Sequence, residues 1–227
     1  MPTIQQSNLD FLIELSDNNN REWFNDHKKT YEVEREKVID FADHLLHKVK
    51  THDNIETPSG KKSLYRIYRD VRFSKDKTPY KTIWSGSFTR ATKLLRGGYY
   101  FHIEAGNSFI AGGFWGPNSA DLKRMRYQIA EYEDEFRAII TDKNFKKHFG
   151  ELKGEQLKTA PKGIDKAHPA IDLLRFKQFL VVRNFSDEEV LSSNFADKIN
   201  ESFEAMRPLF DFMSEALTTN ENGEPIV

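Results

Sequence analysis

An alternating run in the middle of the chain, with a turn and a returning run after it, constrains the fold most strongly. Apolar and polar side chains alternate over residues 98–104, an Ala-Gly-Asn sequence follows at 105–107, and a second run returns over 108–114. A run of period two, a short turn and a returning run are typical of an antiparallel β-hairpin. One face of the first strand holds three polar side chains: Tyr100, His102 and Glu104.

Helical patterns flank this hairpin on both sides. Apolar residues recur every three or four positions over about 21–50, with Asn20 as the expected N-cap, and again over 187–217. This spacing predicts amphipathic helices that bury one face. Residues 84–90 and the compact apolar run at 179–182 predict additional strands.

These elements together predict an α+β fold. We expect a single domain over residues 1–227, with an antiparallel sheet that contains the central hairpin and is packed by N-terminal and C-terminal helices. The polar tail, from about 218 to 227, is expected to be frayed. Segment 65–73 is ambiguous: its β-branched and aromatic residues favour an extended start. The alternative is a helix with a stripe of three arginines: Arg66, Arg69 and Arg72.

Composition narrows the possible functions. The chain has no cysteine, which excludes disulfides, thiolate metal sites and cysteine nucleophiles. No apolar run approaches the roughly 18 residues of a membrane span, and residues 1–15 show no signal-peptide pattern. Motifs typical of nucleotide loops and metal sites are also missing from the sequence. We therefore expect a cytoplasmic protein that uses no metal or cofactor and does not enter a membrane.

Charge is distributed unevenly along the chain although the net charge is only −1. Residues 61–81 carry eight basic and two acidic side chains, whereas 186–227 carry two basic and ten acidic ones. A basic stretch in a nearly neutral chain indicates either a site for an anion or neutralisation by the protein's own carboxylates on folding.

The densest candidate site lies in the basic stretch. We expect Arg66, Arg69 and Arg72 to bind the anionic group, because the guanidinium fork matches phosphate and carboxylate geometry. Asp70 would orient an arginine, and the lysines would add long-range attraction. In the alternative interpretation Asp70, Asp76, Glu104 and the acidic helices neutralise these cations internally. The candidate ligand-binding residues here are Arg66, Arg69, Asp70, Arg72, Lys75, Lys77, Tyr80 and Lys81.

Three more residues outside this stretch are candidates for the same site. Lys158 and Lys162 lie in a Pro/Gly-rich loop, and Trp115 follows the glycine-rich end of the hairpin, where it could stack on a ring. Structural roles, a turn for the loop and a core contact for Trp115, are the alternatives. No catalytic residue stands out, and by residue chemistry alone the candidate proton carriers are His102, His168 and Asp76.

Four long stretches resemble one known family. They are FLIELSDNNNREWFNDHKKTYE (11–32), YRIYRDVRFSKDKTPYKT (65–82), YYFHIEAGNSFIAGGFWGPNSADLKRMR (99–126) and LKTAPKGIDKAHPAIDLLRFKQFLVVR (157–183). In this order they resemble the bacterial and fungal family called domain of unknown function 2461. The resemblance implies a single-domain cytosolic protein. It implies no activity, substrate or cofactor, so no residue role is carried over from the family.

The sequence thus leads to one main functional expectation and two alternatives. The main expectation is binding of an anionic small molecule that bears phosphate or carboxylate, and whether the protein is also an enzyme stays open. The first alternative is a nucleic-acid-binding module, in which the basic stretch contacts phosphates while Tyr68, Tyr80 or Trp115 stack on bases. The second is a protein-interaction domain in which the cations form a purely structural ion-pair network. Oligomeric state cannot be read from the residues.

Overall fold

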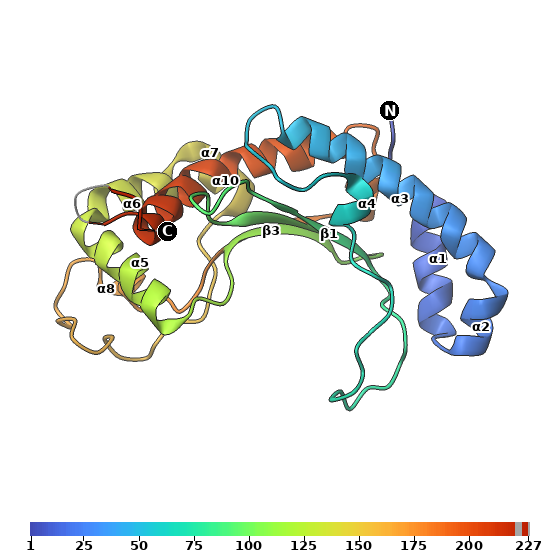
Figure 1. The fold of residues 1–227 in the computed structure, drawn as a ribbon, viewed down its shortest axis with the longest axis horizontal. Helices are drawn as coiled ribbons and strands as arrows, with labels where there is room; N and C mark the ends of the chain where they lie inside the picture. The colour runs from blue at the N-terminus through green and yellow to red at the C-terminus, as the bar shows by residue number, and fades with distance from the viewer. Residues whose placement is uncertain (221–223, 227) are drawn as a thin grey trace. The chain divides into compact units, whose positions relative to one another are not determined.

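The computed structural model describes residues 1–220 and 224–226 (Figure 1). Within these residues the chain forms ten helices and a four-stranded antiparallel sheet with strand order β1-β2-β3-β4. The strands are β1 (Trp84–Thr89), β2 (Gly98–Ile103), β3 (Ser108–Phe114) and β4 (Phe179–Phe185). The helices are α1 (Gln6–Asp17), α2 (Arg21–Asp26), α3 (Lys28–Val49), α4 (Gly60–Ser63), α5 (Ser119–Glu131), α6 (Glu133–Thr141), α7 (Lys143–Phe149), α8 (Ile171–Leu174), α9 (Asp187–Leu191) and α10 (Phe195–Thr218).

The predicted α+β class is confirmed. The hairpin is the β2–β3 pair, and its sequence alternation is matched by alternating burial along both strands. Strands β1 and β4 are also present where the sequence predicted them, although β4 continues to Phe185. Short connections without helices join β1 to β2 and β2 to β3, as antiparallel pairing allows, whereas α5–α8 lie in the chain between β3 and β4.

The chain divides into two compact units. Unit 1 comprises residues 1–88, 100–110 and 184–201, and unit 2 comprises 89–99, 111–183 and 202–227. Each strand of the sheet contributes residues to both units. The extent of a single domain over 1–227 stays a prediction.

In unit 1, the N-terminal helices build an aromatic core. Helices α1 and α3 lie side by side (Figure 1) and bury Phe11, Phe24 and Phe41 almost completely. The long helix expected over 21–50 is interrupted at His27, where the backbone leaves helical geometry and separates α2 from α3. The cap at Asn20 is confirmed, since its side chain accepts a hydrogen bond from the Trp23 backbone N–H at 3.0 Å.

One glycine of unit 1 is required by close packing. The backbone N–H of Gly60, at the start of α4, donates to the Asp43 carboxylate of α3 at 2.6 Å. A Cβ atom on Gly60 would lie 2.4 Å from the Asp43 backbone nitrogen. No side chain fits at this position, so glycine allows α4 to touch the backbone of α3.

In unit 2, helix α10 supplies much of the buried surface. Tyr99, Phe203 and Phe210 pack ring against ring, with centroids 4.7 and 5.2 Å apart for the two pairs that include Tyr99. The helix predicted over 187–217 is divided by residues 192–194 into α9 and α10. Buried Arg90 donates to Asp211 of α10 at 2.5 Å, so this charged side chain is paired.

Two further expectations concern the membrane and the tail. In the part of the chain that is described, every helix is too short or too polar to cross a bilayer. The frayed tail expected at 218–227 lies partly outside the described residues, at 221–223 and 227. Of the described residues there, Thr219 and Pro225 form an antiparallel bridge.

Candidate functional site

The basic segment, residues 65–81, is extended at both ends and looped between them. Backbone bridges join Leu64 to Gly86 and Tyr68 to Tyr80, both antiparallel. The Lys81 N–H also donates to the Ile67 carbonyl at 2.7 Å. The extended start is therefore confirmed as far as Tyr68, and the helical arginine stripe is wrong. Figure 1 shows the segment as a long loop between α4 and β1.

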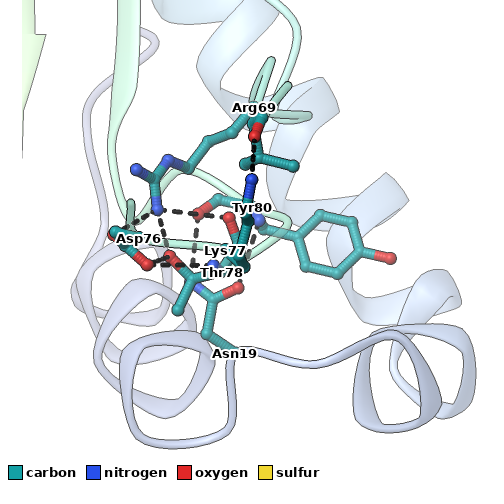
Figure 2. Close-up of polar contacts among 7 residues, drawn as sticks. Asn19, Arg69, Asp76, Lys77, Thr78 and Tyr80 are labelled. Atoms are coloured by element: carbon teal, nitrogen blue, oxygen red, sulfur yellow. Dashed lines mark hydrogen bonds and ion pairs between the residues drawn. The ribbon is translucent and has the colours of Figure 1, made fainter. Parts of the chain in front are cut away.

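Tyr80 anchors the far end of the basic segment. The residue is 5% exposed, and its ring stacks on that of Phe24 with centroids 4.0 Å apart. Its backbone N–H donates to the Asn19 side-chain oxygen at 3.1 Å, and its carbonyl accepts from the Asn19 amide at 3.0 Å (Figure 2). The turn between α1 and α2 thus holds the segment in place. Burial raises the pKa of the Tyr80 hydroxyl, which keeps it neutral.

Arg69 is neutralised within the segment (Figure 2). Its guanidinium lies 2.5 Å from the Asp76 carboxylate, donates to the Thr78 carbonyl at 3.1 Å and contacts the Thr78 hydroxyl. The pKa of Asp76 falls to about 2, first because the Thr78 backbone N–H donates to it and then because Arg69 and the Thr78 hydroxyl do. Asp76 is therefore an ion-pair partner, which weakens its candidacy as a proton carrier.

Arg72 has an internal partner as well. Its guanidinium donates twice to Asp70, at 2.9 and 2.7 Å, in the bidentate geometry that arginine favours. This hydrogen bonding is the first cause of the lowered pKa of Asp70. Both groups are solvent-exposed, so the pair orients the Arg72 side chain but adds little stability.

The other four cations of the segment have no carboxylate within 4.0 Å among the described residues: Arg66, Lys75, Lys77 and Lys81. Of these, Lys77 donates to the Val71 carbonyl at 2.9 Å, and the Lys81 ammonium lies 5.4 Å from the centre of the Tyr65 ring. Burial, followed by repulsion from Arg66, lowers the pKa of Lys81. Internal neutralisation thus accounts for Arg69 and Arg72 but not for Lys81.

Two pockets lie beside these cations in unit 1. One has a volume of about 390 Å³ and includes Asn19, Arg69 and Lys81 in its lining. The other, of about 320 Å³, includes Arg66 together with Arg35. Both are large enough for a phosphate or carboxylate group.

A second polar cluster lies on strand β2, in the same unit. The Tyr100 hydroxyl is 3.0 Å from Nδ1 of His102, and Nε2 of His102 is 3.1 Å from the Glu104 carboxylate. The imidazole stacks on Phe109 with centroids 4.4 Å apart. Burial raises the pKa of Tyr100, a shift that a hydrogen bond with the Ser85 hydroxyl opposes.

This cluster connects to the basic segment through Tyr65. The rings of Tyr65 and Tyr100 have centroids 6.3 Å apart, and the Tyr65 hydroxyl is 3.0 Å from that of Ser87. From the sequence, His102 was a candidate because of its chemistry, but Tyr100 was not identified as its partner. The indication was already in the alternation of the hairpin, which places residues 100, 102 and 104 on one face.

The remaining candidates belong to unit 2. Trp115 is 74% exposed just after β3, and Lys158 and Lys162 are exposed in the loop before α8. His168 uses Nδ1 to accept a hydrogen bond from the Ala170 backbone N–H at 3.1 Å, which indicates a turn-stabilising role. A site that joins these residues to the basic segment stays a prediction. Within the described ranges, no three histidine, aspartate or glutamate side chains gather as metal ligands.

Comparison with known proteins gives one match. A family model described as conserved hypothetical protein (DUF2461) matches residues 7–212, which is most of the chain. Neither the curated proteins nor the solved structures contain a match.

Proposed function

Since the chain belongs to the DUF2461 family, whose description names no activity, we propose a function from the site itself. The protein binds an anionic ligand that bears a phosphate or carboxylate group, and the Lys81 ammonium is its main contact. Arg66 adds attraction at longer range. Arg69 and Arg72 are already paired with Asp76 and Asp70, so they lie near the ligand without being its main contacts.

One observation carries this proposal: Lys81 is a partly buried cation that no described carboxylate approaches within 4.0 Å. Partial burial weakens solvation of the ammonium, and the nearby positive charge of Arg66 adds repulsion. The weaker solvation and the repulsion both destabilise the charged form of Lys81. A bound anion offsets both effects, because it stabilises that charged form. The pocket that Lys81 lines gives such an anion room.

Thermal unfolding in the presence of inorganic phosphate tests the proposal. A ligand present at about 100 times its Kd stabilises the folded state by about 2.7 kcal/mol, so the melting temperature should rise measurably. Lys81→Met should abolish that rise. The matched control is Lys61→Met, which removes an exposed lysine outside the segment and should keep the rise unchanged.

Citrate and a sugar phosphate should be titrated in the same way, to separate carboxylate from phosphate ligands. An unchanged melting temperature with all three compounds at millimolar concentration would contradict the proposal. An equal rise in the wild-type and Lys81→Met proteins would show that an anion binds elsewhere.

A nucleic-acid ligand is the second candidate, because of residues 72–77 at the tip of the basic segment. Phe73 is 96% exposed there, with the Arg72 guanidinium 5.9 Å from its ring centre. Lys75 and Lys77 follow within four residues. An exposed aromatic ring among cations is the combination that stacks on unpaired bases. Fluorescence anisotropy with a single-stranded oligonucleotide tests this, and Phe73→Ala should weaken binding by about 5-fold to 150-fold, which follows from about 1–3 kcal/mol per stacked base.

A further inference from the structure

We propose that Tyr100, His102 and Glu104 form a proton relay that takes a proton from an O–H group of the bound anion or of a water molecule beside it. The inference rests on the proposed function for the ligand class. Its substrates are anionic compounds in which the reacting group lies several atoms from the phosphate or carboxylate.

The hydrogen-bond directions in this cluster follow from the chemistry of its three members. A carboxylate only accepts, so Nε2 of His102 carries the hydrogen that points to Glu104. Nδ1 then has a free lone pair and accepts from the Tyr100 hydroxyl at 3.0 Å. A hydroxyl, a base and a group that orients the base are the arrangement by which enzymes activate an O–H group.

The relay is held in place from both ends. The Asn107 amide donates to the same Glu104 oxygen, at 2.7 Å, and fixes the carboxylate. Stacking on Phe109 fixes the plane of the imidazole, whose side chain is only 12% exposed. Burial raises the pKa of Tyr100. Its hydroxyl therefore keeps its proton until the ligand or water supplies another.

The position of the relay explains which compounds it would accept. Tyr65 stands between the two parts of the site, with its ring 6.3 Å from that of Tyr100 and 5.4 Å from the Lys81 ammonium. An anionic group on Lys81 would therefore leave the rest of the ligand to extend over Tyr65 towards the Tyr100 hydroxyl.

The proposed step consists of two coupled proton transfers. The ligand or water O–H gives its proton to the Tyr100 oxygen, and the electron pair of that bond stays on the donor oxygen. The original Tyr100 proton moves to Nδ1 of His102. The product is an imidazolium opposite the Glu104 carboxylate, which stabilises the new positive charge.

Hydrolysis of two synthetic esters tests the relay without knowledge of the natural substrate. The probes are neutral 4-nitrophenyl acetate and anionic 4-nitrophenyl hydrogen succinate. Water adds to the acyl carbon and gives its proton to Tyr100, while the C–O bond breaks with its electron pair on the 4-nitrophenolate oxygen. Release of 4-nitrophenolate is followed by absorbance, and the melting temperature of each variant confirms that it is folded.

Three variants should slow ester hydrolysis if the relay operates. Tyr100→Phe and His102→Gln should each lower the rate about 100-fold, the usual contribution of general-base catalysis. Glu104→Gln retains an acceptor oxygen but loses the charge, so its loss should be smaller. The matched controls are Tyr132→Phe and His47→Gln, which alter exposed residues outside the site and should leave the rate unchanged.

The outcomes separate the relay from anion binding. Equal rates in the wild-type and Tyr100→Phe proteins with both esters would overturn the relay, even where phosphate binding through Lys81 is demonstrated. If Tyr100→Phe slows both esters and Lys81→Met slows only the succinate ester, the relay and the anion site are both supported. If Tyr100→Phe slows both esters and Lys81→Met slows neither, the relay is supported and the proposed anion site fails.

Discussion

Asp76 illustrates how a candidate proton carrier becomes a structural group. Its carboxylate accepts hydrogen bonds from the Thr78 backbone N–H, from the Thr78 hydroxyl and from Arg69. Each donor favours the ionised form, so the pKa of the carboxyl falls to about 2. A carboxylate with so low a pKa is a weak base, and its oxygens already accept three hydrogen bonds, which leaves His102 as the better candidate in unit 1.

The Arg69→Gln variant tests this account of Asp76. Removing the guanidinium should raise the Asp76 pKa from about 2, yet leave it below the ordinary 3.8, because the Thr78 N–H, the largest cause, remains. The measurement is an NMR titration of the Asp76 side chain. A pKa at or above 3.8 in the variant would show that the arginine alone is responsible.

The same shift predicts a pH dependence of stability. The folded-state pKa lies below the unfolded value, so the ionised Asp76 stabilises the fold fully above about pH 3.8, and this contribution is lost as the pH falls through about 2. Asp76→Asn should therefore lower the unfolding free energy at neutral pH and make little difference near pH 2. Urea titrations of both proteins at several pH values measure this, and a difference that persists at pH 2 would contradict it.

At the scale of elements, the basic segment depends on an anchor supplied by α2. Phe24 is 1% exposed and carries the stacked Tyr80 ring. Phe24→Ala should lower the unfolding free energy by about 3–5 kcal/mol, since it deletes a buried aromatic ring and leaves a cavity. The variant should also weaken phosphate binding, because Lys81 follows Tyr80 directly. Denaturant unfolding and phosphate titration measure the two effects, and full phosphate affinity in the variant would show that the anchor does not position Lys81.

Short-range patterns made several elements predictable from the sequence. The β2–β3 hairpin follows from the period-two alternation of β2 and the turn after it, and the cap at Asn20 follows from a side chain that accepts a backbone hydrogen bond at a helix start. The start of α1 was harder to predict, because its capping box uses Gln5 and Asn8 instead of the usual Ser or Thr with Glu or Gln.

Interruptions of the long helices and the partners of the cations were harder to predict. The break at His27 contains no glycine or proline, so local preference gives no indication of it. The contact between Asn19 and Tyr80 joins residues 61 positions apart, and it exists only because the aromatic core brings α2 to the basic segment. Likewise, the Arg69–Asp76 pair depends on the path of the loop between them.

At the scale of the whole molecule, the net charge is only −1. The attraction between the basic segment and a ligand therefore depends on the few cations near the ligand. A small anion held mainly by Lys81 meets one or two cations. Its affinity should fall only modestly between about 50 and 200 mM salt, whereas a nucleic acid with six or more phosphate contacts should lose about 10³-fold. Binding titrations of phosphate and of an oligonucleotide across that range distinguish the two ligands. A steep loss for the oligonucleotide with no phosphate binding would favour the nucleic-acid function.

The protonation of Lys81 itself gives the most direct test of the central claim. In the free protein its pKa should lie below the ordinary 10.5. A bound anion stabilises the ammonium, so the pKa should rise when phosphate is added. NMR of a ¹³C-labelled lysine side chain, assigned with Lys81→Met, measures the titration in phosphate and in chloride at equal ionic strength. A clear rise in phosphate alone is the predicted result, and identical titration curves in the two salts would contradict anion binding at Lys81.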